Sequence, residues 1–195
     1  MFVRLSRQLA SVRVGSNYHN RDGELVKIAK IVVNPHYVQD SLVNNIALIR
    51  LVKSLTFNDV VKQAVLATYD DELYDGTKLT ISGWGFDNVA NGRNPFLLKK
   101  ATVYYQELEI CKNAYSKRSV VVPSGTICAG EINYIGSSIC EGDQGGPLVQ
   151  TTKAKGDRVF GIASFALNCG ATFTPSVFTD VRQYLDWINQ VLMTN

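Results

Sequence analysis

The stretch that most constrains the fold is Cys140–Val149, which reads Cys-Glu-Gly-Asp-Gln-Gly-Gly-Pro-Leu-Val. Its three glycines predict a tight loop, because glycine adopts backbone conformations that other residues rarely reach. Pro147 and the apolar residues after it predict that the loop leads into a strand. The backbone N–H groups of Gly142 and Gln144 are then placed to converge on one point, as an oxyanion hole requires. Yet Gln144 carries a carboxamide, whose nitrogen lone pair is delocalised and cannot act as a nucleophile.

The composition is that of an ordinary globular protein. The 195 residues are 46% hydrophobic and 19% charged, with a net charge of +3, and such a chain can form a core without a metal. Basic residues are spread along the chain, so we expect no nucleic-acid partner. No apolar run is long enough for a membrane helix, and Arg4 and Arg7 interrupt the start of the chain, which does not resemble a secretory signal. Neither a Cys-x-x-Cys pair nor a histidine cluster occurs, so we expect no metal and no cofactor.

Short runs of β-branched and aromatic residues, separated by Gly, Asn, Asp and Pro, predict an all-β fold. The expected strands lie at about Ser11–Gly15, Leu25–Val33, Ile46–Val52, Lys78–Gly83, Leu97–Gln106, Thr126–Gly130, Gly146–Thr152, Arg158–Ala166 and Ser176–Val181. Two helices are expected: Glu107–Lys117, and a terminal helix in which Tyr184, Trp187, Ile188, Val191 and Leu192 follow a 3.6-residue period. The chain has two conceivable dividing points, Asp71–Tyr74 and Asn88–Asn94.

Four cysteines, Cys111, Cys128, Cys140 and Cys169, permit three pairings, and the sequence alone does not choose among them. Their even number indicates disulfides and an oxidising compartment. Free thiols in a cytosolic protein are the alternative.

Several segments of the chain resemble the trypsin/chymotrypsin family of serine proteases, and they occur in the family's order. They are Ser11–Ser16, Lys27–Tyr37, Asn44–Leu51, Ile81–Gly85, Val122–Gly130, Cys140–Val149, Gly161–Ala166 and Pro175–Val181. The resemblance covers nearly the whole chain from about Leu9 and implies a double six-stranded β-barrel with a C-terminal α-helix. It also implies that Cys111 pairs with Cys128 and Cys140 with Cys169.

The chain departs from the family at its beginning. The family's activated amino terminus and its Ala-Ala-His-Cys type segment are both absent from the sequence. We therefore expect one serine-protease-like domain over residues 1–195 with an amino-terminally truncated fold. A partial first barrel would extend to about residue 90, a complete second barrel from about 91 to 183, and the C-terminal helix over 184–195.

Three positions decide whether the family's chemistry is possible. That chemistry needs a serine nucleophile, a histidine base and an aspartate that orients the histidine. The resemblance places Gln144 at the serine position and Asn45 at the aspartate position, and the histidine position is missing. We interpret His19 and His36 as surface or turn residues, because both lie outside the segments that carry the catalytic positions. The sequence therefore predicts that this chain is not an enzyme.

The specificity pocket of the family departs from its usual residues too. Its matching positions are Ser138, Ser164, Phe165, Ala166 and Ser176. Ser138 supplies no carboxylate at the base of the pocket, and Ala166 and Ser176 replace glycines that keep it open. These changes are interpreted either as drift after activity was lost or as a reshaping that stops substrate insertion.

Asp143 poses a separate problem. In the family this carboxylate pairs with the α-amine that activation cleavage creates. Because a buried, unpaired carboxylate is costly, we expect Asp143 either to remain exposed or to find a backbone partner.

The leading hypothesis is a catalytically inactive homologue that acts by binding protein. The segment Val12–Gly23 resembles mite trypsin-like allergens, and the pattern of losses resembles the inactivated protease paralogues of the scabies mite. That resemblance implies a secreted protein, with no membrane partner, that interferes with host serum proteases and complement. The alternatives are an active endopeptidase with relocated catalytic residues, and an incomplete fragment of a longer trypsin-like protein.

Overall fold

The computed structural model describes residues 10–87, 92–131, 136–167, 169 and 174–194. Its strands are β1 (Ser11–Val14), β2 (Glu24–Val33), β3 (Ala47–Leu51), β4 (Lys78–Gly83), β5 (Lys99–Gln106), β6 (Thr126–Gly130), β7 (Pro147–Thr152), β8 (Gly156–Phe165) and β9 (Ser176–Asp180). The helices are α1 (Leu108–Ser116), the 3-10 turn η1 (Val181–Tyr184) and α2 (Leu185–Thr194). All the expected strands and both helices are present, each with small differences in length at most.

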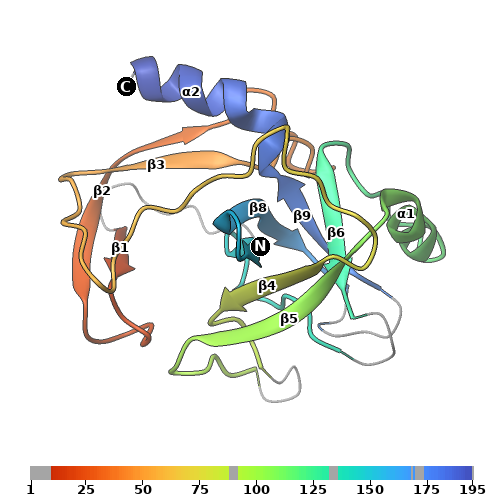
Figure 1. Cartoon of the computed structure of the whole chain (residues 1–195), viewed down its shortest axis with the longest axis horizontal. Helices are drawn as coiled ribbons and strands as arrows, with labels where there is room; N and C mark the ends of the chain where they lie inside the picture. Colours follow the sequence, from red (N-terminus) through yellow and green to blue (C-terminus); the bar gives the residue numbers. More distant parts are fainter. Residues whose placement is uncertain (1–9, 88–91, 132–135, 168, 170–173, 195) are drawn as a thin grey trace.

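Six strands form a closed antiparallel barrel in the order β4-β5-β6-β9-β8-β7 (Figure 1). Its interior is filled by alternate apolar side chains, among them Leu79, Val103, Leu148, Phe160 and Phe178, each 1% exposed or less. Every residue of β6 and β9 is buried, because these strands face the barrel core on one side and α1 or neighbouring segments on the other. This barrel holds the largest cluster of buried apolar side chains.

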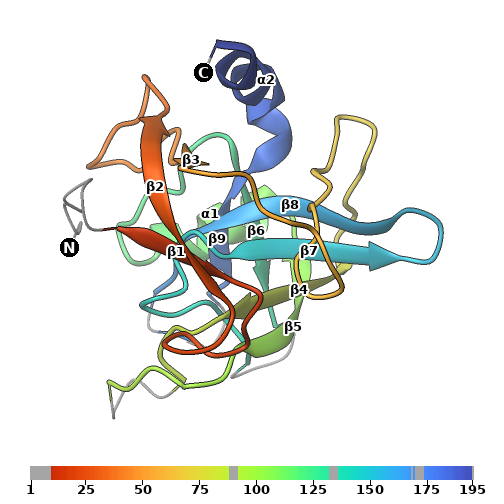
Figure 2. The ribbon, with the colours of Figure 1, turned by 90° about the vertical axis from the view of Figure 1, so that its left-hand side faces the viewer.

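The remaining strands form a three-stranded antiparallel sheet in the order β1-β2-β3, which lies beside the barrel (Figure 2). The register pairs Val12 with Val26 and Ile31 with Ile49, which puts a continuous set of apolar side chains on one face of the sheet. Ile49 and Val33 on this face are 51% exposed. Among the described residues, β1 and β3 pair only with β2, so the expectation of a complete second barrel and a partial first one is confirmed.

The expected boundary between the two parts, near residue 90, was wrong. Strand β4 pairs with β5 along its whole length, from Lys78 to Gly83, and with β7 at Thr80 and Ile81. A strand that pairs on both sides within the closed barrel belongs to that barrel. The division therefore precedes Lys78, in the region of the alternative at Asp71–Tyr74.

Helix α2 and the turn before it join the two parts. Leu48 of β3 and Ile46 just before it pack in one apolar cluster with Val181, Tyr184 and Ile188. The face that the 3.6-residue period predicts is therefore packed in its first part, whereas Leu192, which was expected on the same face, is 67% exposed. The Tyr184 hydroxyl also lies 3.1 Å from Oδ1 of Asn44 on the sheet side. None of the described helices is long and apolar enough to cross a membrane.

Two disulfides reinforce the barrel half. Cys111 on α1 is joined to Cys128 on β6, and Cys140 is joined to Cys169. This is the pairing that the family resemblance implies. The second bridge anchors the loop from which the candidate site is built.

Candidate functional site

The loop from Cys140 to Gly146 is held in one conformation by its own backbone. The Asp143 N–H donates to the Cys140 carbonyl at 3.0 Å, and the Gly146 N–H donates to the Asp143 carbonyl at 2.9 Å. Gly142 has a φ of +98°, and a Cβ there would lie 3.1 Å from the Cα of Gly85. Glycine is needed at this position both for the left-handed conformation and for the close approach.

The side chain of Gln144 is folded back onto this loop. Its Oε1 accepts a hydrogen bond from the Gly142 N–H at 2.9 Å. The carboxamide oxygen therefore occupies one of the two backbone donors that the sequence assigned to an oxyanion-like site. The sequence places a carboxamide in the glycine frame, but it carries no signal for this side-chain conformation.

Asp143 is half-buried and takes two backbone donors. The Gly85 N–H donates to Oδ1 at 2.7 Å, and the Cys140 N–H donates to Oδ2 at 2.9 Å. Of the two expectations, the backbone partner is confirmed and the exposed carboxylate is wrong. A Cβ at Gly83 or Gly85 would collide with this carboxylate, which explains why the Ile81–Gly85 segment needs both glycines.

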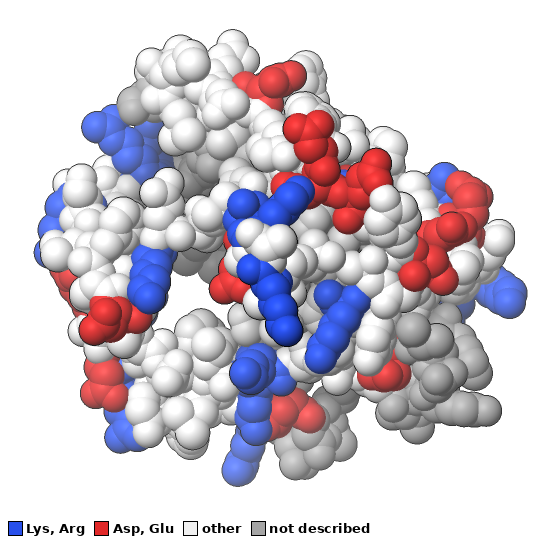
Figure 3. Space-filling model, in the orientation of Figure 1, with Lys and Arg blue, Asp and Glu red and all other residues white. Residues whose placement is uncertain are grey.

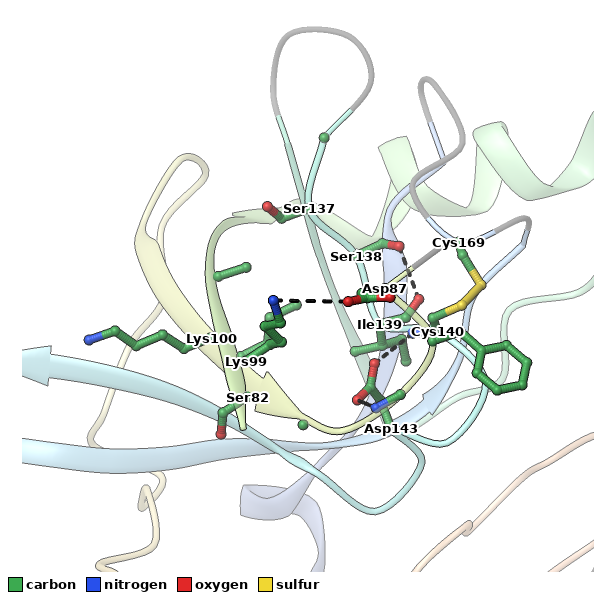
Figure 4. Close-up of a pocket in the computed structure, with 16 residues that line it drawn as sticks. Ser82, Asp87, Lys99, Lys100, Ser137, Ser138, Ile139, Cys140, Asp143 and Cys169 are labelled. Atoms are coloured by element: carbon green, nitrogen blue, oxygen red, sulfur yellow. Dashed lines mark hydrogen bonds and ion pairs between the residues drawn. A yellow bond between two sulfur atoms is a disulfide. The ribbon is translucent and has the colours of Figure 1, made fainter. Parts of the chain in front are cut away.

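A cavity of about 560 Å³ opens beside Asp143 (Figure 4). Lys99 points across it toward Asp87, with 3.9 Å between the ammonium and the carboxylate. Lys100 points away from the cavity in this view, and Ser138 lines it with its hydroxyl turned onto the Ile139 carbonyl at 3.0 Å. The pairing of Lys99 with Asp87 has no signal in the sequence, where Lys99 belongs to an ordinary basic pair.

Five positions were expected to form a specificity pocket. Ser138 lines the cavity beside Asp143, and the other four do not. Ser176 is fully buried, and its hydroxyl accepts the Ile139 N–H at 3.1 Å. Phe165 packs edge-on against Tyr115 with 5.6 Å between ring centroids, and Ala166 packs against the barrel core.

Asn45 lies where the sheet meets the barrel. Its Nδ2 donates to the Ser164 hydroxyl on β8 at 2.9 Å, and its carbonyl accepts from the Thr179 hydroxyl on β9 at 2.8 Å. The loop that carries Gln144 reaches the same end of β8, because the Gly145 N–H donates to the Ala163 carbonyl at 2.9 Å. The structure thus brings Asn45 and the Gln144 loop to neighbouring residues of one strand.

Both histidines are exposed, as expected. His19 stacks on Phe96, with 5.9 Å between the ring centroids. The backbone of His36 accepts a hydrogen bond from Asn44 and donates one to Asn34. The side chains at the two positions that the resemblance assigns to catalysis, Gln144 and Asn45, are carboxamides that do not take up a proton near neutral pH. Within the described part of the chain, no group of three or more His, Cys, Asp or Glu side chains is placed to hold a metal ion.

Comparison with known proteins agrees with this architecture. The family model described as trypsin matches residues 4–188. A trypsin of Phaedon cochleariae is 31% identical over 180 residues, which are 92% of this chain and 67% of that protein. A vitellin-degrading protease of Bombyx mori is 32% identical over 179 residues, or 92% of this chain and 65% of the relative. The chain therefore spans about two thirds of the length of these relatives, and by the extent of the match it belongs to the trypsin family.

Proposed function

We propose that this chain is a non-catalytic member of the trypsin family that acts by binding another protein. The observation that carries the proposal is Gln144, which stands at the nucleophile position and accepts the Gly142 N–H at 2.9 Å. A carboxamide supplies no hydroxyl or thiol for covalent catalysis. Its oxygen also takes a donor that an oxyanion would need.

Asn45 supports the same proposal. Its Nδ2 donates to Ser164, and as a neutral amide it offers no negative charge to stabilise an imidazolium. In active enzymes of the family, the corresponding change from aspartate to asparagine lowers turnover by roughly 10⁴-fold. With both residues replaced, the scaffold keeps the loops of a protease without the groups that run its reaction, and binding is the function that such loops can still perform.

The proposal extends to location and partner. Two disulfides favour an oxidising compartment, and we place the protein outside the cell. The resemblance of Val12–Gly23 to mite proteins supports a role in host interaction, with serum proteases of the complement system as the partners. This part of the proposal depends on that resemblance and not on the geometry of the loop.

The first test is chemical. Purified chain is incubated with a fluorophosphonate probe, and adducts are detected by intact mass. In parallel it is incubated with a peptide library to detect cleavage. An active trypsin is the positive control in both experiments. We expect no adduct and no cleavage. An adduct on any serine, or sequence-specific cleavage that follows the purified chain, would establish an active endopeptidase with relocated residues and overturn the proposal.

The second test addresses the partner. The chain is added to human serum in a haemolytic complement assay, with its reduced and alkylated form as the control. We expect lysis to fall with the native chain only. Unchanged lysis would remove complement as the partner while leaving the chemical result untouched.

A further inference from the structure

Two loops that come from the two separate sheets are fastened to each other. The Leu98 N–H, in the β4–β5 connection, donates to the Asn17 carbonyl in the β1–β2 loop at 2.7 Å. The indole N–H of Trp84 donates to the same carbonyl at 3.1 Å. Tyr18 and Leu97 form an antiparallel bridge beside them. A surface that is held by backbone contacts in this way loses little conformational entropy when it binds a partner.

The β1–β2 loop is also fixed internally. The Ser16 hydroxyl donates to the Arg21 carbonyl at 2.8 Å and accepts the Tyr18 N–H at 2.8 Å. Gly23 closes the loop with a φ of +62°, and a Cβ there would collide with the Val14 carbonyl. These contacts fix the backbone of the loop at Arg21.

The joined loops present aromatic and basic side chains to solvent. Phe96 is 68% exposed and Leu97 49%, His19 stacks on Phe96, and the guanidinium of Arg21 lies 3.8 Å from the centre of the Tyr18 ring. We call this surface the aromatic ridge; its residues are Tyr18, His19, Arg21, Trp84, Phe96 and Leu97. Single exposed apolar residues are ordinary, but Tyr, Trp, Phe and Arg gathered on one surface are the composition of binding hot spots.

The charge around the aromatic ridge is positive. The β1–β2 loop (residues 15–23) and the segment from Trp84 to Lys100 contain four basic side chains, Arg21, Arg93, Lys99 and Lys100, against two acids, Asp22 and Asp87. Of the four, Lys99 lies 3.9 Å from Asp87, so Arg21, Arg93 and Lys100 exceed the one remaining acid, Asp22. Figure 3 shows basic side chains through the centre and lower middle of this face, while acidic ones lie at its upper right and also at its left edge and lower middle. A partner that docks here therefore meets a small excess of basic side chains around an apolar centre.

We propose that the aromatic ridge is the docking surface of this protein, and that it binds an acidic polypeptide segment that carries an aromatic or aliphatic side chain. The inference rests on the proposed binding function and names the chemistry of the partner. A partner carboxylate pairs with Arg21, whose charge is held in place over Tyr18. A neighbouring apolar side chain covers Phe96 and Leu97.

The test uses three fluorescein-labelled peptides of about twelve residues and the whole chain, measured by fluorescence anisotropy. One peptide carries Asp, Glu, Phe and Leu; the second replaces its acids with Lys; the third keeps the acids and replaces Phe and Leu with Ser. We expect the first peptide to bind, the second not to bind, and the third to bind at least about ten-fold more weakly. Arg21→Glu and Phe96→Ser should each weaken the first peptide by about ten-fold or more.

Lys117→Glu is the matched control. It makes the same change of charge at an exposed position just after α1, and it should leave binding within about two-fold. Equal loss in Lys117→Glu and Arg21→Glu would show attraction by net charge alone and overturn the proposal. An affinity of Phe96→Ser for the first peptide equal to that of the wild type would also overturn it. The same holds if heparin, a polyanion without apolar side chains, binds more tightly than the first peptide and Phe96→Ser does not change its affinity. None of these outcomes alters the fluorophosphonate result, so the two proposals fail separately.

Discussion

The closed barrel and the three-stranded sheet are both antiparallel, yet they bury their apolar residues to different degrees. The sheet buries Val26 but leaves Val33 and Ile49 51% exposed. All five residues of β9 are buried, whereas none of the five residues of β3 is. Strand β3 (Ala-Leu-Ile-Arg-Leu) is more apolar than β9 (Ser-Val-Phe-Thr-Asp), so composition does not explain the difference. The barrel closes on itself and covers its inner face, while the sheet has two unpaired edges among the described residues. Closure, and not the strand pattern, decides where stability resides.

The largest expected effect comes from truncating a leucine in each region. Leu148 on β7 is fully buried in the barrel core, and Leu148→Ala should lower the free energy of unfolding by about 2–5 kcal/mol. Leu25 on β2 is 56% exposed, and Leu25→Ala should cost less than about 1 kcal/mol. Urea unfolding of both variants measures the difference. Similar losses of stability in the two variants would mean that the sheet is covered in solution, and the two regions would then not differ in burial.

Both disulfides lie in the barrel region, and we expect them to increase the difference in stability between the barrel and the sheet. Cys111 and Cys128 are separated by 17 residues, and a loop of that length gives about 3 kcal/mol in the chain-entropy model. The double variant Cys111→Ala/Cys128→Ala should lose about that much stability in the same urea experiment. The Cys140–Cys169 bridge remains in this variant as an internal control, and an unchanged midpoint would show that α1 is held to β6 by packing alone.

A smaller effect depends on pH and on the segment that joins the two regions. The Lys155 ammonium, 2.5 Å from Oδ1, and then the Thr68 N–H, 2.9 Å from Oδ2, lower the pKa of Asp71 to about 2. A carboxyl group whose folded pKa is below its unfolded value of about 3.8 stabilises the fold above that value. This stabilisation is lost as the pH falls from about 4 toward 2.

Thermal unfolding between pH 5 and pH 2 measures this dependence. We expect Tm to fall with pH, and Asp71→Asn to flatten part of that fall because it removes the titrating group. Lys155 is 53% exposed, so high salt should weaken the contribution. An identical pH profile for wild type and Asp71→Asn would assign the acid sensitivity to other carboxyl groups.

The strands of both regions were predictable because they depend on local patterns. Lys78–Gly83 and Thr126–Gly130 have the bounds that alternation and turn residues indicated. The partners of a strand are not local: β4 pairs with β7, whose Leu148 and Val149 are far from it in sequence. For that reason the sequence assigned β4 to the wrong half of the chain.

The candidate site was predictable in residue type and not in side-chain direction. Gln144 and Asn45 could be named from the sequence, because they lie in two segments that resemble the family, Cys140–Val149 and Asn44–Leu51. The fold of the Gln144 carboxamide onto Gly142 depends on loop geometry, and the choice of Gly85 and Cys140 as donors to Asp143 depends on a contact between distant segments. Neither leaves a pattern in the sequence.

The smallest expected effect is the closest test of the comparison, because it makes the same substitution of similar volume in both regions. Val33→Thr replaces a methyl with a hydroxyl on a residue that is 51% exposed at the end of β2, and should change stability by no more than about 0.5 kcal/mol. Val103→Thr on β5 buries the hydroxyl in a fully buried position of the core and should cost about 1–3 kcal/mol. A loss of stability in Val33→Thr equal to that in Val103→Thr would place Val33 in a buried contact, and the sheet would then have to be regarded as closed.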